Sequence, residues 1–149
     1  YTSCYRWATQ TGTTHKRHAA AAALIKYNNL KYKIMTAKKY EVWLANLDPR
    51  IGTETGKIRP VLIVQTDLLN NIHPSTLICP ITTNTVLESH ILRVHLKKGT
   101  AKVKENCDIM IDQLRAIDNK RLIKKMGELP DNIAERVKEN IRIVLDLED

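Results

Sequence analysis

Cysteine is scarce in this chain, and the few cysteines lack the spacing of a metal or redox motif. Cys4, Cys79 and Cys107 form no CxxC pair, and none of the five histidines stands at a metal-ligand spacing from them. The pattern therefore disfavours the disulfide-stapled and zinc-binding classes of small domain. Isolated, reduced thiols are typical of a cytoplasmic protein, and we expect that compartment.

Long apolar runs are absent too, and so are acidic residues from the first quarter of the chain. No stretch reaches the length that crosses a membrane, so we expect no membrane contact. Residues 1–39 carry eight Lys and Arg and no Asp or Glu, whereas 40–149 carry equal numbers of basic and acidic residues. The net charge of +8 therefore describes the N-terminal segment and says little about nucleic-acid binding by the rest.

The N-terminal segment differs from the rest in composition, which predicts a boundary. It mixes Thr, Tyr and basic residues with an alanine run at 19–23, and the first methionine is Met35. Basic residues before a short apolar run faintly resemble a secretion signal, but Lys26 interrupts the run and export is not favoured. We expect 1–38 to be a basic extension, mobile or not native, and 39–149 to fold as one domain.

Residues 39–149 read as short strands followed by one helix. Apolar and alternating runs predict strands, Asp67 begins a short turn or helix, and the apolar spacing after Pro130 predicts an amphipathic helix of about four turns. The expected strands cover 40–47, 60–66, 75–83, 91–97 and 107–111. Several short strands and one helix indicate a mainly β (α+β) fold built on a small, strongly bent sheet or barrel.

A phosphate-binding loop of the Walker type is absent. Three residues separate Gly52 from Gly56 where that motif needs four, and Ile58 follows Lys57 where it needs Ser or Thr. Binding of a nucleoside triphosphate is therefore disfavoured. Two interpretations of the loop remain, a hinge between strands or a flap over a substrate groove that contributes Glu54 and Lys57.

Polar residues at the ends of two apolar runs form the main candidate site. Arg59 enters the run that begins at Pro60, and Thr82 and Thr83 leave the run 77–81. A guanidinium fork stays charged and suits phosphate, and an alcohol can donate to a phosphate oxygen. Together they can stabilise the charge that builds up when a ribose 2′-hydroxyl attacks a phosphodiester. A surface arginine paired with Glu54 or Asp112 accounts for the local pattern equally well.

Further polar residues follow other predicted strands. Asp112 can orient Arg59, act as a base or simply close a turn, and Gln113 can contact a nucleic-acid base. Lys97 and Lys98 can track a nucleic-acid backbone or belong to a solvated loop, which is the more common case. The histidines form no acid–base pair. His95 shares a face with Arg93 on a strand expected to be half exposed, and we do not expect it to be catalytic.

Four ordered blocks of sequence resemble the MazF/PemK family of toxins from type II toxin–antitoxin systems. The first runs from Val42 to Pro49, and the second holds Gly52-Thr53-Glu54 and Gly56 to Val64. The third is Cys79-Pro80-Ile81-Thr82-Thr83, and the fourth runs from Asp112 to Asp118, with Arg121-Leu122 and Gly127-Glu128-Leu129 before the final helix. The resemblance covers roughly 39–147.

This resemblance implies an SH3-like barrel of the MazF/Kid/CcdB type that forms a homodimer. It implies a sequence-specific, ribosome-independent endoribonuclease of single-stranded RNA, an mRNA interferase, that needs no metal or cofactor. Its products are a 2′,3′-cyclic phosphate and a 5′-hydroxyl, and a cognate antitoxin blocks its RNA groove.

By position in the resembling blocks, Arg59 matches the family's catalytic arginine and Thr82 its catalytic threonine. Glu54 matches an acidic loop residue, and Asp112 an acidic position that serves catalysis in one branch. That branch also uses a loop histidine and an arginine where this chain has Thr53 and Met110, so we favour catalysis by Arg59 and Thr82. The residues expected to bind RNA are Lys57, Thr83, Asn84, Gln113, Lys97 and Lys98.

Alternatives to the ribonuclease share the same fold. A non-enzymatic, CcdB-like toxin would act by docking a protein, through its C-terminal helix rather than Arg59 and Thr82. A degenerate member would bind RNA without cutting it. Within the ribonuclease reading, Arg59 either carries a proton as well as stabilising charge, or only stabilises charge while another group acts as base.

Overall fold

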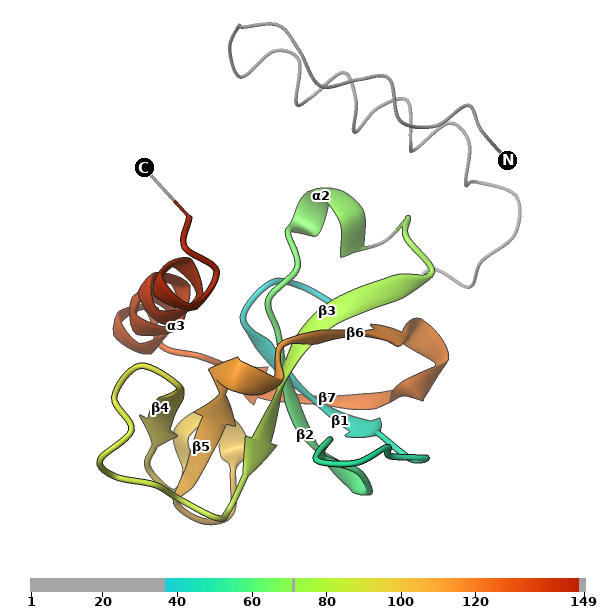
Figure 1. The fold of residues 1–149 in the computed structure, drawn as a ribbon. Coiled ribbons are helices and arrows are strands. Elements are labelled where there is room, and N and C mark those ends of the chain that lie inside the picture. Colours follow the sequence, from blue (N-terminus) through green and yellow to red (C-terminus); the bar gives the residue numbers. More distant parts are fainter. Residues whose placement is uncertain (1–36, 71, 148–149) are drawn as a thin grey trace, which may run out of the picture.

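The computed structural model describes residues 37–70 and 72–147, and its core is a bent antiparallel sheet with one long helix against it (Figure 1). The expectations for residues 1–36 lie outside the described residues. The strands are β1 Glu41–Asn46, β2 Ile58–Ile63, β3 Ser75–Thr82, β4 Arg93–Leu96, β5 Cys107–Met110, β6 Arg115–Asp118 and β7 Leu122–Glu128. The helices are α2 Asp67–Asn70 and α3 Asp131–Val144, with 3₁₀ turns η1 Thr100–Lys102, η2 Ile111–Gln113 and η3 Asn119–Arg121.

Strand β3 organises the sheet because it pairs with three neighbours. The order is β4-β5-β3-β2-β1-β7, and β6 also pairs with β3. One edge of β3 carries β2, while the other carries β6 along its first half and β5 at its end. The long green arrow in Figure 1 therefore runs from one half of the sheet into the other, and the sheet bends around it. This confirms the predicted mainly β fold with a C-terminal helix.

The barrel stays open between its end strands. Among the described residues β4 and β7 end the hydrogen-bonded path and do not pair with each other. Turn η1 approaches β7 closely instead, since a Cβ added to Gly127 would lie 2.8 Å from the backbone of Ala101. Only a residue without a side chain permits this approach, which brings the β4–β5 half of the sheet against β7.

Two apolar clusters cover the two faces of the sheet. Alternation along the paired strands separates them, because successive side chains point to opposite faces. The first cluster includes Val42, Leu62 and Cys79, and α3 packs Ala134 and Val137 into it. The second includes Trp43, Val61 and Ile78, together with the fully buried Ala37. Ala37 precedes the expected boundary at residue 39, so the described fold already includes it.

The predicted elements match the structure with local differences. Strand β2 begins at Ile58 rather than at 60, and β4 is shorter than expected, with Leu92 exposed outside it. Helix α3 begins after Pro130 as predicted. Strands β6 and β7 were not predicted. Strand β7 is mostly exposed and contains two adjacent lysines, so its sequence shows no apolar alternation. Its pairing with β1 shifts register at two places.

Candidate functional site

Arg59 and Thr82 lie on neighbouring strands at the same end of the sheet. Arg59 is half-buried near the start of β2, and Thr82 is the last residue of β3. The paired residues of these strands run from Ile63 and Ile78 to Val61 and Pro80. Extended by two residues, the same alignment brings Arg59 to the level of Thr82. Because paired residues point to the same face, both side chains belong to the face of the second apolar cluster.

The guanidinium of Arg59 is held from one side only. Its Nε donates to the carbonyl oxygen of Gly56 at 2.7 Å. Within residues 37–70 and 72–147 no carboxylate lies in ion-pair range of Arg59. The pairing with Glu54 or Asp112 that the sequence left open is not formed, because those two carboxylates bind other arginines. A fixed and uncompensated cation therefore stands at this end of the sheet.

The loop 48–57 is tied at both ends, which positions Arg59. The carboxylate of Asp48 accepts a hydrogen bond from the backbone N–H of Lys57 at 2.8 Å. The backbone carbonyl of Asp48 accepts one from the guanidinium of Arg121 at 2.6 Å. Gly56 is buried, and a Cβ there would lie 2.6 Å from Oδ1 of Asp48. The side chain of Lys57 is exposed beside this turn, with a positive backbone φ of 66°.

Arg115 anchors the tip of the same loop to the sheet. It donates to Oε2 of Glu54 at 3.0 Å and to the carbonyl of Thr55 at 2.8 Å, from a position on β6 opposite Ile78. Sequence reasoning gave Arg115 no role. The signal was present, since Arg115 lies at the start of its strand and Arg59 lies near the start of its own. Nε of Arg115 and Oγ1 of Thr55 are buried without a hydrogen-bond partner in the described structure.

A polar row, Thr82, Asp108 and His95, crosses β3, β5 and β4. Thr82 stands opposite Asp108, and Asp108 opposite His95. His95 Nδ1 lies 2.9 Å from Oδ1 of the buried Asp108, whose Oδ2 accepts the N–H of Val86 at 2.7 Å. Thr82 Oγ1 accepts from the backbone N–H of Asn84 at 3.2 Å, which leaves its proton free for another acceptor.

The remaining predicted residues spread around this end of the sheet. Asp112 lies on η2 and pairs with Arg93 at 3.4 Å, and Gln113 follows it, half-buried. Thr83 and Asn84 are exposed and continue directly from Thr82. The exposed Lys97 and Lys98 follow β4, beside the turn in which Lys98 N donates to Asn106. Within residues 37–70 and 72–147 none of these residues hydrogen-bonds or ion-pairs with Arg59, whose side chain binds Gly56, so the structure does not bring all of them to one point.

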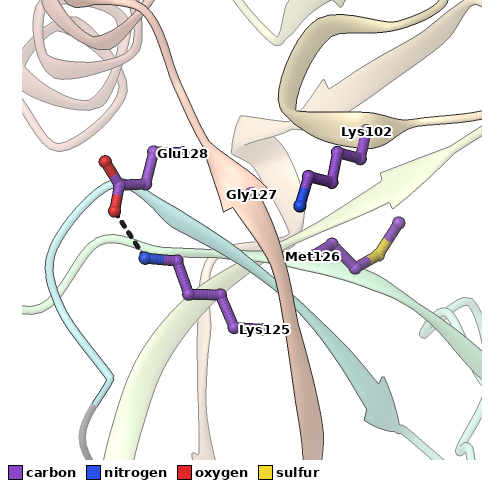
Figure 2. A pocket seen from close by; sticks show the side chains of 5 residues that line it. All are labelled: Lys102, Lys125, Met126, Gly127 and Glu128. Atoms are coloured by element: carbon purple, nitrogen blue, oxygen red, sulfur yellow. Dashed lines mark hydrogen bonds and ion pairs between the residues drawn. The ribbon is translucent and has the colours of Figure 1, made fainter.

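A surface hollow of about 420 Å³ lies elsewhere, on β7. Figure 2 shows Lys125 turned toward Glu128, and Lys125 also binds the buried Glu41 at 2.8 Å. These contacts raise the pKa of Lys125 and neutralise its charge. Lys125 is therefore already paired, and Lys102 is the other cation that lines the hollow.

The described ranges contain no group of three or more His, Cys, Asp or Glu side chains arranged to hold a metal ion. They also contain no helix long and apolar enough to cross a membrane. Both free cysteines in these ranges are buried, and burial raises the pKa of Cys79 to about 12 and that of Cys107 to about 11. Neither thiol is a nucleophile at neutral pH.

The fold and the site define a small, mainly β protein with an uncompensated arginine and a threonine at one end of its sheet. Residues 38–145 match the family of PemK-like, MazF-like toxins of type II toxin-antitoxin systems. The chain is also 31% identical over 115 residues to endoribonuclease EndoA of Bacillus subtilis (strain 168), covering 77% of this chain and 99% of that protein. The chain belongs to this toxin family.

Solved structures share the fold. MazF (Form-I) of Deinococcus radiodurans aligns with a TM-score of 0.65 and 20% identity, over 78% of this chain and all of that one. A MazE-MazF structure (Form-II) from the same organism aligns with a TM-score of 0.62 and 20% identity, over 76% of this chain and 99% of that one. At this identity the likeness concerns the fold alone.

Proposed function

We propose that this endoribonuclease of the MazF-like toxin family cuts single-stranded RNA at a short sequence, without a ribosome and without a metal ion. In the proposed reaction a ribose 2′-hydroxyl attacks the adjacent phosphorus, which leaves a 2′,3′-cyclic phosphate and a 5′-hydroxyl. The observation that carries this proposal is an uncompensated Arg59 near the start of β2 and Thr82 at the end of β3, on paired strands whose register brings the two residues to one end and one face of the sheet.

Arg59 and Thr82 have different roles in this reaction. Attack on phosphorus adds negative charge to the non-bridging oxygens, and a fixed cation aimed at them stabilises the transition state. The Nε bond to Gly56 holds the guanidinium in place and leaves both Nη groups for the phosphate. Thr82 donates its hydroxyl proton to a phosphate oxygen. Arginine does not give up a proton in the working pH range, so Arg59 acts by electrostatics and not as the base.

Glu54 and Asp112 support the site through their arginine partners. Glu54 binds Arg115 and so fixes the loop that carries Gly56, while Asp112 holds Arg93 on β4. Both carboxylates are already engaged by an arginine. Their contribution is to keep the two arginines and the loop in one arrangement.

RNA is held by exposed polar groups around this end of the sheet. Lys57 and the pair Lys97 and Lys98 extend into solvent at opposite sides of the polar row. Exposed lysines bind the phosphate backbone without reading sequence, and their binding weakens as salt rises. The groups proposed to contact nucleotides next to the cut phosphate are Thr83, Asn84 and Gln113.

The proposed partners follow from the family. A MazE-MazF structure shares this fold, and we propose that this chain forms a homodimer and is inhibited by a cognate antitoxin. Exposed apolar side chains such as Leu77, Ile123 and Ile58 supply surface for such contacts. An acidic antitoxin segment would compete with RNA for Arg59 and the lysines. We place the activity in the cytoplasm, where buried, reduced cysteines are stable.

The test is cleavage of a long, unstructured RNA by the purified protein in the presence of EDTA. We expect cuts at one short motif, with 5′-hydroxyl ends. Thr82→Ala should slow cleavage about 10²–10³-fold, the cost of one preorganised donor, and Arg59→Ala should slow it more. Arg136→Ala, an exposed arginine on α3, is the matched control and should cleave normally. Uncut RNA with the wild-type protein, or cleavage that needs added metal, contradicts the proposal.

A further inference from the structure

The proposed reaction needs a base for the 2′-hydroxyl, and the polar row contains a histidine held in the form that a base requires. Asp108 is 1% exposed, and both of its oxygens accept hydrogen bonds, one from Val86 N and one from His95 Nδ1. An ionised carboxylate only accepts, so Nδ1 of His95 carries the proton. The lone pair of the neutral ring is therefore on Nε2.

We propose that His95 is the general base of RNA cleavage and that Asp108 is the residue that positions it. This inference rests on the proposed ribonuclease function and deepens it by naming the group that removes the proton. The arrangement of carboxylate, imidazole and substrate hydroxyl is the one that activates a weak oxygen nucleophile in other enzymes.

The register places this pair beside the phosphate site. His95 and Thr82 flank Asp108 on adjacent strands, and all three residues point to one face. Two strand spacings separate the backbones of Thr82 and His95 by roughly 10 Å. The side chain of His95 extends from one side, and a ribose attached to a phosphate on Thr82 extends from the other. The side chain of His95 is 34% exposed, and its Nδ1 is the ring nitrogen that faces Asp108.

The proton balance of the step is complete without a further reactant. Nε2 of His95 accepts the proton of the 2′-hydroxyl while the 2′-oxygen forms its bond to phosphorus. The bond from phosphorus to the 5′-oxygen breaks, and this oxygen takes a proton from water. The imidazolium then releases its proton to solvent, so the net change is one RNA strand converted to two. Arg59 stabilises the charge on phosphorus throughout.

A purely structural role for the pair is the competing explanation. Asp108 ties the loop 83–92 to the sheet through Val86 N, and His95 supplies a hydrogen-bond partner to a buried carboxylate. Loss of stability alone therefore does not distinguish the two roles, whereas a pH profile does. The charged and titratable groups next to His95 are Arg93 on its own strand with its partner Asp112, Lys97 just after the strand, and Asp108 on β5.

The experiment compares His95→Gln with wild type in single-turnover cleavage of RNA from pH 5 to pH 9. Wild-type cleavage should rise with pH until the imidazole is neutral. His95→Gln should be about 10²–10⁴-fold slower, the usual worth of a general base, and should lack this rise. His73→Gln is the matched control, because His73 precedes the other end of β3 and binds Ser75.

Two further variants separate catalysis from folding. Added imidazole should restore part of the activity of His95→Ala, which a structural loss would not permit. Asp108→Asn keeps an acceptor for Val86 N but donates to Nδ1, so it moves the proton to Nε2 and should also slow cleavage. Wild-type rate and pH profile in His95→Gln, with Arg59→Ala inactive, would overturn the inference and leave the ribonuclease proposal standing. No metal-free cleavage by wild type would overturn both.

Discussion

Gly56 is the residue whose substitution most directly tests how the loop positions Arg59. A Cβ at this position would lie 2.6 Å from Oδ1 of Asp48 and 3.0 Å from Cβ of Arg50. The same Asp48 oxygen accepts Lys57 N at 2.8 Å, and the carbonyl of Gly56 accepts Nε of Arg59 at 2.7 Å. Gly56→Ala therefore disturbs the turn and the anchor of Arg59 together.

The size of the effect follows from these contacts. A hydrogen bond to a charged acceptor is worth about 1.5–3 kcal/mol, and overpacking costs about 1–3 kcal/mol. Asp48 is exposed and can turn aside, so a total of about 2–3 kcal/mol is expected. At about 4 °C per kcal/mol this lowers Tm by roughly 10 °C. A displacement of the guanidinium by about 1 Å should slow cleavage about 10²-fold.

Gly52→Ala in the same loop is the control. Gly52 has a φ of +57°, but nothing lies within 4 Å of its added Cβ. Gly52→Ala should lower the free energy of unfolding only by the conformational penalty of about 1–2 kcal/mol, and it should leave the cleavage rate unchanged. The assays are thermal unfolding and single-turnover cleavage at a temperature where both variants are folded. Equal rates for the two variants would refute the claim that the turn at Gly56 sets the position of Arg59.

Two other substitutions probe the carboxylates. Burial raises the pKa of Glu41, but hydrogen bonds from Lys125, Lys38 N and Trp43 outweigh it and lower the pKa overall. The ionised Glu41 thus stabilises the folded protein at neutral pH, and this contribution is lost as pH falls through the lowered pKa. Glu41→Gln should therefore lower Tm at pH 7, and the difference in Tm from wild type should shrink in acid. A difference in Tm that stays constant with pH would contradict this. Glu54→Gln should slow cleavage less than about tenfold because it loses only an exposed ion pair, and a 10²-fold loss would give Glu54 a direct catalytic role.

The periodicity of the chain was sufficient for the strands that are buried. Strands β1, β3 and β5 and helix α3 appear where apolar runs and spacing predicted them, because burial on one or both faces leaves that pattern in the sequence. Strand β7 shows no such pattern in the sequence. Most of its side chains are exposed, and it is held by the ladder to β1, by the pair of Lys125 with the buried Glu41 and by the close approach of η1 at Gly127.

The candidate site was predicted only in part for a related reason. Arg59 and Thr82 were found because each stands at the end of an apolar run. Asp108 was overlooked because it lies inside one, and His95 was set aside as an exposed strand residue. Their relation depends on the pairing of β4 with β5, and a residue's partner across a ladder is not visible from its neighbours in sequence.

By itself the amino-acid sequence determined the family, the mainly β class and the two residues proposed to hold the phosphate, because these depend on ordered local blocks and on alternation along single strands. The tertiary structure alone decided which charges compensate one another. Glu54 and Asp112 pair with Arg115 and Arg93 and leave Arg59 uncompensated, while Asp108 orients His95. The physical reason is that ion pairs and hydrogen bonds act over a few ångströms, and strand register determines which distant residues come that close.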